Sequence, residues 1–314
     1  MIGVQTSGFL QRVIKHVSTI RISLLVCIFM ICQFNGLSQV SLTNGSPSAT
    51  IDFSNTTPTG VGTNTSTAYT GVGFSPNPTN ATAGRLNSNA WQVTGWSFGN
   101  LNFGGSILTD DYARGSTAGA VTTGGFYAYT GAPGSVANPT LMMQPAGSDF
   151  APGTLTLRVQ NNGSTIITQL ALNYNLYIRN NESRSNSFNF SYSTDNSNYT
   201  DVVALDYTST AAADALGWVI VGSAPSRSTT ITGLYITPGS YLYIRWSSAD
   251  VGGSGSRDEF GLDDINMTAT YSAPCIPPTT QASIPTFSNI FATQMDVNFT
   301  RGNGSGGVLI VAST

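Results

Sequence analysis

Residues 154–179 read TLTLRVQNNGSTIITQLALNYNLYIR and alternate apolar with polar side chains over much of their length. Leu155, Leu157 and Val159 alternate with threonines and Arg158, and the same spacing returns from Leu170 to Arg179. Successive side chains of a strand point to opposite faces of the sheet, so this period of two is typical of strands with one buried face. The stretch therefore predicts half-buried β-strands.

The same alternation recurs toward the C-terminus, and no stretch shows a helical period. It covers 188–192, 216–220, 242–246 and 265–271. Many such strands separated by turn-forming residues, in a chain long enough to bury a substantial core, are typical of an all-β sandwich. We predict a two-sheet antiparallel sandwich of the jelly-roll type.

Two regions differ in how clearly they predict strands. Residues 188–203 (FNFSYSTDNSNYTDVV) are the clearest hairpin, with the turn at 195–198. Residues 54–150 are rich in Gly, Asn, Thr and Pro. We expect long loops there, with strands around 91–98 and 125–129.

The N-terminus has the pattern of a secretory signal peptide. Basic residues between Arg12 and Arg21 precede an apolar run at 22–32 (ISLLVCIFMIC), and residues 36–39 supply small and polar residues for cleavage. A transmembrane anchor is the alternative, but the run is about half the usual length of a membrane span. We predict that residues 1–39 are removed and that the protein is secreted or displayed on the cell surface, with no membrane span after cleavage.

The composition after residue 39 excludes several kinds of chemistry. No histidine and no lysine follow, and Cys275 is the single cysteine, so it is either unpaired or paired outside this chain. The usual general base near neutral pH and the common nitrogen ligand of zinc are therefore missing. Nine arginines remain against fifteen acidic residues, a formal charge of −6. That charge argues against nucleic acid as a partner and is compatible with calcium.

A domain boundary is predicted at residues 272–280 (SAPCIPPTT), because three prolines cannot continue a central strand. We assign 40–273 to the sandwich, 274–282 to a linker and 283–314 to the opening strands of a second, smaller β-domain. Those last residues are too few for a complete sandwich of roughly 100 residues. We therefore expect further domains beyond Thr314.

Carboxylates are densest near the last predicted strand of the sandwich, between Asp250 and Asp264. Asp263 has the parity of Ile265, so an unbroken strand would turn it inward, where an unpaired carboxylate is costly. One solution is structural Ca²⁺, because the first and last strands of a jelly roll are commonly neighbours. The other is pairing with an arginine such as Arg257 or with backbone N–H groups. The candidate calcium ligands are Asp52, Asp258, Glu259 and Asp263.

Aromatic side chains are the candidates for ligand binding, since sugar faces stack on flat rings. Trp246 alternates in phase with Leu242 and Ile244, so it is expected on the core side of its strand. Tyr177 alternates in phase with Asn175, so it is expected on the surface. The candidate binding residues are Trp91, Trp96, Tyr127, Tyr129, Tyr177 and Trp218.

Catalysis is not predicted. A glycosidase needs two carboxyl groups flanking the scissile bond, and the chain after residue 39 holds only two glutamates, Glu182 and Glu259. The ExDxxE pattern of sandwich-fold glucanases is absent. No catalytic residue is assigned.

Several segments together resemble a known kind of extracellular module. They are ATIDFSN (49–55), the stretch at 154–179, FSYSTDNSNYTDV (190–202), SYLYIRWSSAD (240–250) and DEFGLDDINMT (258–268). They resemble an uncharacterised jelly-roll-like sandwich of large secreted or surface proteins from Gram-negative bacteria that use type IX secretion. The closing GLDDI is also similar to the last strand of MAM-type and carbohydrate-binding jelly rolls, and residues 278–311 resemble the start of a fibronectin type III repeat. The resemblance implies architecture and location, and an accessory role.

Two functions follow from these observations. The first is a non-catalytic structural or adhesion module of a larger secreted or cell-surface protein. The alternative is a carbohydrate-binding module that serves a downstream enzyme domain, with a polysaccharide as its partner.

Overall fold

The computed structural model of the protein describes residues 40–54, 68–76, 83–131, 138–273, 279–280 and 282–303. The chain divides into two compact units between Thr270 and Tyr271. The predicted signal peptide, Cys275 and the last residues of the predicted second β-domain, 304–314, lie outside the described residues. Among the described residues, no helix has the length and apolar character that a membrane crossing needs.

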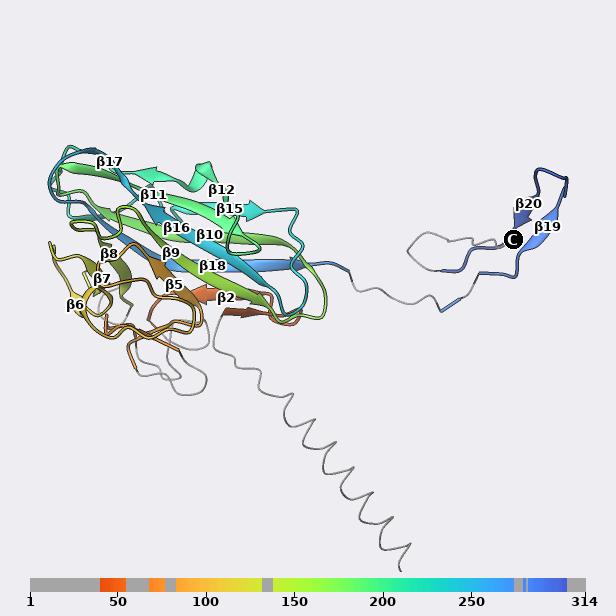
Figure 1. Ribbon diagram of the computed structural model, residues 1–314, viewed down its shortest axis with the longest axis horizontal. Helices are drawn as coiled ribbons and strands as arrows, with labels where there is room; N and C mark the ends of the chain where they lie inside the picture. The colour runs from red at the N-terminus through yellow and green to blue at the C-terminus, as the bar shows by residue number, and fades with distance from the viewer. Residues whose placement is uncertain are drawn as a thin grey trace, which may run out of the picture. The chain divides into compact units, whose positions relative to one another are not determined.

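The first unit is a β-sandwich, as predicted, and its strands lie in two layers (Figure 1). The first sheet has eight strands in the order β1-β9-β16-β11-β12, with β5 paired to β9 and with β13 and β17 paired to β11. These are β1 (Val40–Leu42), β5 (Trp91–Thr94), β9 (Gly153–Asn161), β11 (Arg184–Ser193), β12 (Thr200–Asp201), β13 (Tyr207–Thr208), β16 (Tyr241–Ser248) and β17 (Asp250–Gly253).

The second sheet also has eight strands, in the order β14-β10-β18-β8-β7-β6, with β15 paired to β10 and β2 paired to β18. These are β2 (Ser48–Ile51), β6 (Ser116–Thr117), β7 (Gly125–Tyr129), β8 (Thr140–Gln144), β10 (Ile167–Arg179), β14 (Trp218–Ile220), β15 (Arg227–Ile231) and β18 (Glu259–Tyr271). The first unit also has a small parallel pair, β3 (Phe74–Ser75) with β4 (Leu86–Asn87), and two 3₁₀ turns, Asp110–Tyr112 and Val203–Leu205.

The strongly alternating segments form the long central strands. Along β16 the side chains of Leu242, Ile244 and Trp246 are buried, and the residues between them are half-buried. Trp246 lies at the centre of the core, as predicted, with its ring 6.4 Å from that of Trp91 and 5.5 Å from that of Tyr174. Burial of these large rings between the two sheets removes apolar surface from water and so favours folding.

The predicted hairpin is confirmed. β11 pairs antiparallel with β12, Ser191 opposite Asp201 and Tyr192 opposite Thr200. The Asp195 carboxylate closes the turn by accepting hydrogen bonds from the backbone N–H groups of Ser197 and Asn198, both at 2.8 Å. The strands expected within residues 54–150 also form, as β5 and β7.

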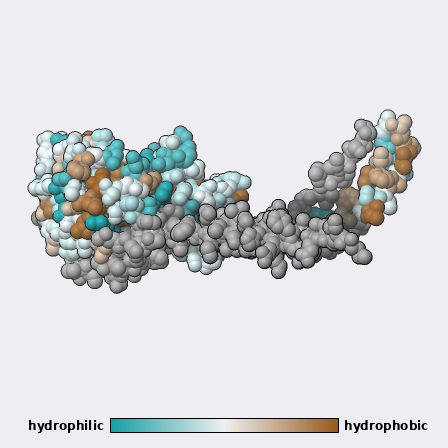
Figure 2. Space-filling view, turned by 60° about the horizontal axis from the view of Figure 1, so that its bottom comes forward, coloured by the Kyte–Doolittle hydropathy of each residue, from teal (hydrophilic) through white to brown (hydrophobic). Residues whose placement is uncertain are grey.

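The second unit contains one antiparallel pair among its described residues, β19 (Thr286–Ser288) with β20 (Asp296–Asn298). Figure 2 shows hydrophobic residues on its surface. The exposed apolar side chains there are Ile284, Phe287, Ile290, Phe291, Met295 and Val297.

Candidate functional site

Two of the six aromatic residues predicted to bind a ligand are part of the core. Trp91 is fully buried beside Trp246. Trp96 packs 4.9 Å from Phe126 and 5.3 Å from Phe150. Neither ring is available to a ligand, because each fills the space between the sheets.

The other four predicted aromatic residues share the outer face of the second sheet. Tyr127 and Tyr129 of β7 lie there, opposite Met142 and Thr140 of β8. The ring of Tyr129 is 4.6 Å from that of Trp218. On the adjacent strands, a Cβ atom placed on Gly261 of β18 would meet Trp218 at 3.1 Å and Tyr177 at 3.3 Å. We call this surface the β18 face; it is formed by Tyr127, Tyr129, Met142, Tyr177, Trp218, Glu259, Gly261 and Asp263.

The β18 face is covered rather than open. Tyr127, Tyr129 and Tyr177 expose only 6%, 5% and 8% of their surface, so the prediction that Tyr177 lies at the surface was wrong. Val121 packs on the tyrosines and Met142, and the hydroxyl of Tyr127 donates to the carbonyl of Thr123 in the same loop. Trp218 is half-buried and is the most accessible of the predicted binding residues.

Two buried carboxyl groups lie on the β18 face. Glu259 Oε1 accepts a hydrogen bond from the Val121 N–H at 3.2 Å, and its Oε2 has no partner among the described residues. Asp263 accepts hydrogen bonds from the Thr140 hydroxyl at 3.3 Å and from the Asp264 N–H at 2.8 Å. Burial raises the pKa of Glu259 to about 7, and burial together with the neighbouring Asp264 raises that of Asp263 to about 8.

Asp263 does not point into the core, in contrast to the expectation for an unbroken strand. Asp264 has a positive φ of 48°, which interrupts the alternation of β18. The buried apolar residues are consequently Phe260 and Leu262 before the interruption and Ile265 and Met267 after it. Asp263 therefore lies on the same side as Glu259, and the backbone N–H of Asp264 is its main donor. No arginine among the described residues pairs with it.

The four predicted calcium ligands do not form one site. β2 and β18 are neighbours, as expected, and the charge of Asp52 acts on Asp263. Asp258, however, accepts a hydrogen bond from the Glu182 N–H, whereas the adjacent Glu259 bonds Val121. Within the described part of the chain, no group of three acidic, histidine or cysteine side chains could hold a metal ion.

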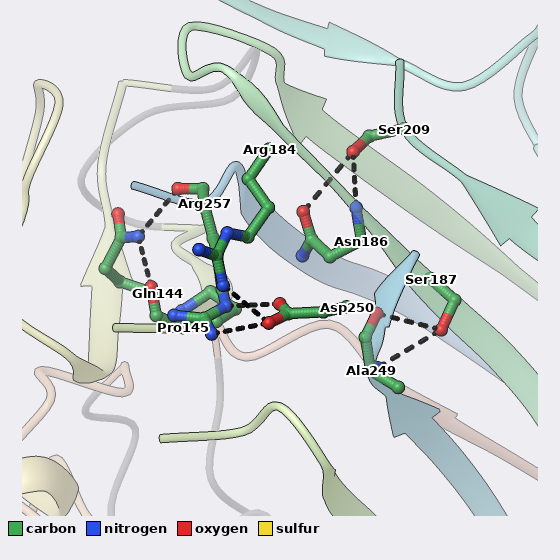
Figure 3. A network of polar contacts seen from close by, with 9 residues as sticks. All are labelled: Gln144, Pro145, Arg184, Asn186, Ser187, Ser209, Ala249, Asp250 and Arg257. Atoms are coloured by element: carbon green, nitrogen blue, oxygen red, sulfur yellow. Dashed lines mark hydrogen bonds and ion pairs between the residues drawn. The ribbon is translucent and has the colours of Figure 1, made fainter. Parts of the chain in front are cut away.

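Arg257, the suggested partner of Asp263, pairs with Asp250 instead (Figure 3). Its guanidinium donates to both Asp250 oxygens, at 2.6 and 2.8 Å, and Arg184 reaches the same carboxylate at 2.6 Å. These charge-assisted bonds lower the pKa of Asp250. The adjacent Ala249 exchanges hydrogen bonds with the Ser187 hydroxyl, so the network fixes the end of β16 against β11.

The outer face of the first sheet is more open and carries a second set of rings. Tyr241, Tyr243 and Arg245 alternate with the buried residues of β16 and are half-buried. Opposite them on β9 lie Gln160, Arg158 and Thr156. We call this surface the β16 face; it is formed by Gln92, Phe103, Arg158, Tyr199, Tyr241, Tyr243 and Arg245.

The arginines of the β16 face are held by aromatic rings. The Arg158 guanidinium lies 4.5 Å from the centre of the Phe103 ring and 4.7 Å from that of Tyr241. The Arg245 guanidinium lies 3.4 Å from the centre of the Tyr199 ring. Such cation–π contacts fix the position of a side chain that is otherwise flexible.

The turn at residues 195–199 crosses the β16 face from β11 to β5. Asn196 donates to the Gln92 side-chain carbonyl at 3.3 Å, and the Tyr199 hydroxyl donates to Asn196 at 2.6 Å. Gln92 in turn donates to Asn102 at 3.5 Å, beside Phe103. The face is therefore built from five separate segments of the chain: β5, the loop at 102–103, β9, the turn at 195–199 and β16.

A hollow of about 340 Å³ lies beyond the crossing turn, on the same side of the sheet. Its lining residues are mostly small, with hydroxyl and amide groups among them, and it ends at Ser187 and Ala249 of the network in Figure 3. The lining residues are Thr94, Pro152, Gly153, Thr154, Ser187, Asn189, Ser247, Ser248 and Ala249. Half-buried rings, arginine side chains and a hollow lined partly by hydroxyl groups thus follow one another along β16.

The sequence contained a signal for this face that the prediction did not use. Leu242, Ile244 and Trp246 were assigned to the core. The residues that alternate with them in a half-buried strand must then face outward. Tyr241, Tyr243 and Arg245 occupy that parity. Their partners Phe103 and Tyr199 come from loops that strand alternation does not place.

Comparison with known proteins gives matches only among solved structures: no family model and no curated protein matches the chain. One match is the CBM22-1 xylan-binding domain from Paenibacillus barcinonensis Xyn10C, with 12% identity and a TM-score of 0.29 over 47% of this chain and 82% of that chain. A non-crystalline cellulose specific carbohydrate-binding module, CBM28, matches with 12% identity and a TM-score of 0.28 over 45% and 78%. The K2 cleaved adhesin domain of Lys-gingipain matches with 14% identity and a TM-score of 0.28 over 46% and 83%. Likenesses at this level say nothing about a ligand of this chain.

Proposed function

We propose that the protein is a non-catalytic extracellular module that binds polysaccharide through the β16 face. The proposal adopts the second of the two functions predicted from the sequence and moves the binding site from the predicted aromatic set to Tyr241 and Tyr243. Secretion through the predicted signal peptide at residues 1–39 belongs to the same proposal.

The observation that carries the proposal is the row of half-buried rings along β16, next to a hollow whose lining includes hydroxyl and amide groups. Sugar rings present an apolar face that packs on aromatic side chains and hydroxyl groups that need hydrogen-bond partners. Tyr241 and Tyr243 supply the rings, with centres 6.1 Å apart. Gln92, Asn189 and the threonines of the hollow supply amide and hydroxyl groups on the same side of the sheet.

The placement of carboxyl groups favours binding over hydrolysis. Asp195 is the carboxylate that the turn brings to the β16 face, and its oxygens are occupied by Ser193, Ser197 and Asn198. Glu259 and Asp263 lie on the other sheet, four residues apart along β18, or about 13 Å between their Cα atoms. A glycosidase needs two carboxyl groups on either side of one bond.

Retention of the purified whole chain on a panel of insoluble and soluble polysaccharides tests this function, with Ca²⁺ and with EDTA. We expect specific retention that the Tyr241→Ala/Tyr243→Ala double variant loses. Tyr235→Ala is the matched control, because Tyr235 is 71% exposed and follows Leu234, next to the Ile167–Ile236 bridge of the second sheet. Absence of retention on the whole panel would leave the structural or adhesion role, and loss of retention in EDTA would restore calcium to the proposal.

A further inference from the structure

The arginines of the β16 face differ from the paired arginines elsewhere in the molecule. Arg114, Arg184 and Arg257 form ion pairs with aspartates. Arg158 and Arg245 form none with any described residue. Arg179 and Arg227 also lack an ion pair among the described residues, so the distinctive feature of the β16 face is that it carries two such arginines side by side.

Both guanidinium groups are fixed in place but keep donors to spare. Arg158 uses its Nε to bond the Asn89 carbonyl, and Arg245 uses its Nε to bond the Thr156 hydroxyl at 3.0 Å. No hydrogen bond joins the terminal nitrogens of either group to a described residue. Each group therefore presents the forked edge that matches a carboxylate or sulfate oxygen pair.

The two arginines are also close enough to act on one ligand chain. β9 and β16 pair antiparallel, with Arg158 opposite Tyr243 and Arg245 opposite Thr156. This register makes the two arginines diagonal neighbours, with their Cβ atoms about 7 Å apart. The nearby Asp195 forms no ion pair with either arginine among the described residues, because its carboxylate oxygens accept hydrogen bonds from Ser193, Ser197 and Asn198 within its own turn.

We infer that the β16 face selects an anionic polysaccharide, with Arg158 and Arg245 binding the carboxylate or sulfate groups while Tyr241 and Tyr243 contact the sugar rings. This inference rests on the proposed function and narrows it to one class of glycan. Uronic acids and sulfate esters share the required chemistry, a planar or tetrahedral oxyanion repeated along a chain of sugars.

Affinity electrophoresis of the intact chain in gels that contain one polymer each tests the inference. Alginate and polygalacturonate represent uronates, dextran sulfate represents sulfate esters, and dextran and xylan are neutral. We expect one class of anionic polymer to retard the protein. Added salt should weaken this retardation, because the contacts are partly exposed. Retardation by uronates or by the sulfated polymer identifies which oxyanion is bound.

Variants separate the arginine contribution from net charge. Arg158→Gln and Arg245→Gln should each weaken anionic binding about tenfold, the effect of losing a charged hydrogen bond. Arg301→Gln, in the second unit, changes the net charge equally and should leave binding unchanged. Arg245→Lys, which keeps the charge and loses the fork, should bind at an intermediate level, and thermal melts of all variants identify any that fail to fold.

The possible failures are distinguishable. The inference would be overturned if dextran or xylan retarded the protein as much as the anionic polymers do, and if only the tyrosine double variant, not the arginine variants, lost this retardation. The proposed function would then stay in place. Equal retardation by DNA or polyphosphate would overturn it as well, because simple charge attraction would then suffice. Absence of retardation by every glycan would overturn the proposed function itself.

Discussion

The two outer faces of the sandwich use aromatic residues in opposite ways. On the β18 face, Tyr129 and Tyr177 are covered, and the carboxyl groups of Glu259 and Asp263 are buried beside them. On the β16 face, Tyr241 and Tyr243 remain half-exposed and their neighbours are arginines and amides. Rings on the first face therefore contribute to folding, whereas rings on the second are available to a ligand.

The difference has a structural cause in the loops. The loop that carries Val121 and Thr123 packs on the β18 face and bonds both Glu259 and Tyr127. The turn at 195–199 only crosses the β16 face and leaves a hollow of about 340 Å³ on one side. The polar turn at 195–199 therefore leaves part of the β16 face accessible, whereas the loop that carries Val121 packs on the tyrosine rings and covers the β18 face.

The largest expected effect is the stability difference between the same substitution on the two faces. Tyr129→Ala removes a buried ring and should lower the free energy of unfolding by about 3 kcal/mol. Tyr243→Ala removes a half-exposed ring and should cost less than about 1 kcal/mol, while it weakens glycan binding. Urea unfolding followed by circular dichroism measures both, and equal losses would show that the two faces are packed alike.

The second effect is a pH dependence centred on the β18 face, because the carboxyls of Asp258 and Asp264, whose pKa values burial also raises, contribute less in the same direction. The folded-state pKa values of Glu259 and Asp263, about 7 and about 8, lie above the ordinary carboxyl values, so the folded protein holds these protons more tightly than the unfolded chain. The contribution of these two carboxyls to the free energy of unfolding is therefore greatest below about pH 4. It falls as the pH rises toward 8, by up to about 1.4 kcal/mol per pH unit for each carboxyl.

Urea unfolding of the protein at a series of pH values checks this slope. Between about pH 5 and about pH 7 we expect each of the two carboxyls to lower the free energy of unfolding by about 2 kcal/mol, so Asp263→Asn should remove about half of the total fall. Asp52, Asp264, Arg179 and Glu182 also act on these two carboxyls. Asp195 and Asp250 have lowered pKa values, so they change the stability only at pH values near and below the ordinary aspartate pKa, which is outside this window. Stability that rises from pH 5 to 7 would contradict the burial of the two groups.

Strand alternation predicted much of the fold but less of the site. It identified β9, β10 and β16 and the core position of Trp246, because each depends on the period of a single strand. It also selected four aromatic residues that do share one face, Tyr127, Tyr129, Tyr177 and Trp218. It did not show that this face is covered, because the Val121 loop reaches it through a contact with Glu259, 138 residues away in sequence.

Two other features were beyond a strand-by-strand analysis. The positive φ of Asp264 changes the side on which Asp263 lies, and an aspartate in a strand sequence does not indicate such an interruption. The pairing of Arg158 with Tyr241 depends on the register between β9 and β16, which lie far apart in the chain. Long-range pairing and loop placement, rather than local periodicity, therefore determine which face keeps accessible rings.

The smallest expected effect concerns the glycine at the centre of the β18 face. A methyl group on Gly261 would lie 2.7 Å from the Thr140 methyl carbon and 3.1 Å from the Trp218 ring, so Gly261→Ala should cost about 1 kcal/mol and displace the tryptophan outward. Gly252 of β17 is the matched control, because it also lies in a strand and has no atom within 4 Å of the added position.

Thermal unfolding and tryptophan fluorescence of the two alanine variants measure the cost and the displacement. A red-shifted emission in Gly261→Ala but not in Gly252→Ala would show that Trp218 is held against the sheet by the absence of a side chain at 261. Unchanged stability and emission in both would mean that the β18 face yields to an added methyl group as an open surface does. Its tyrosines would then be accessible after a small movement of the covering loop, and the distinction between the two faces would be one of degree.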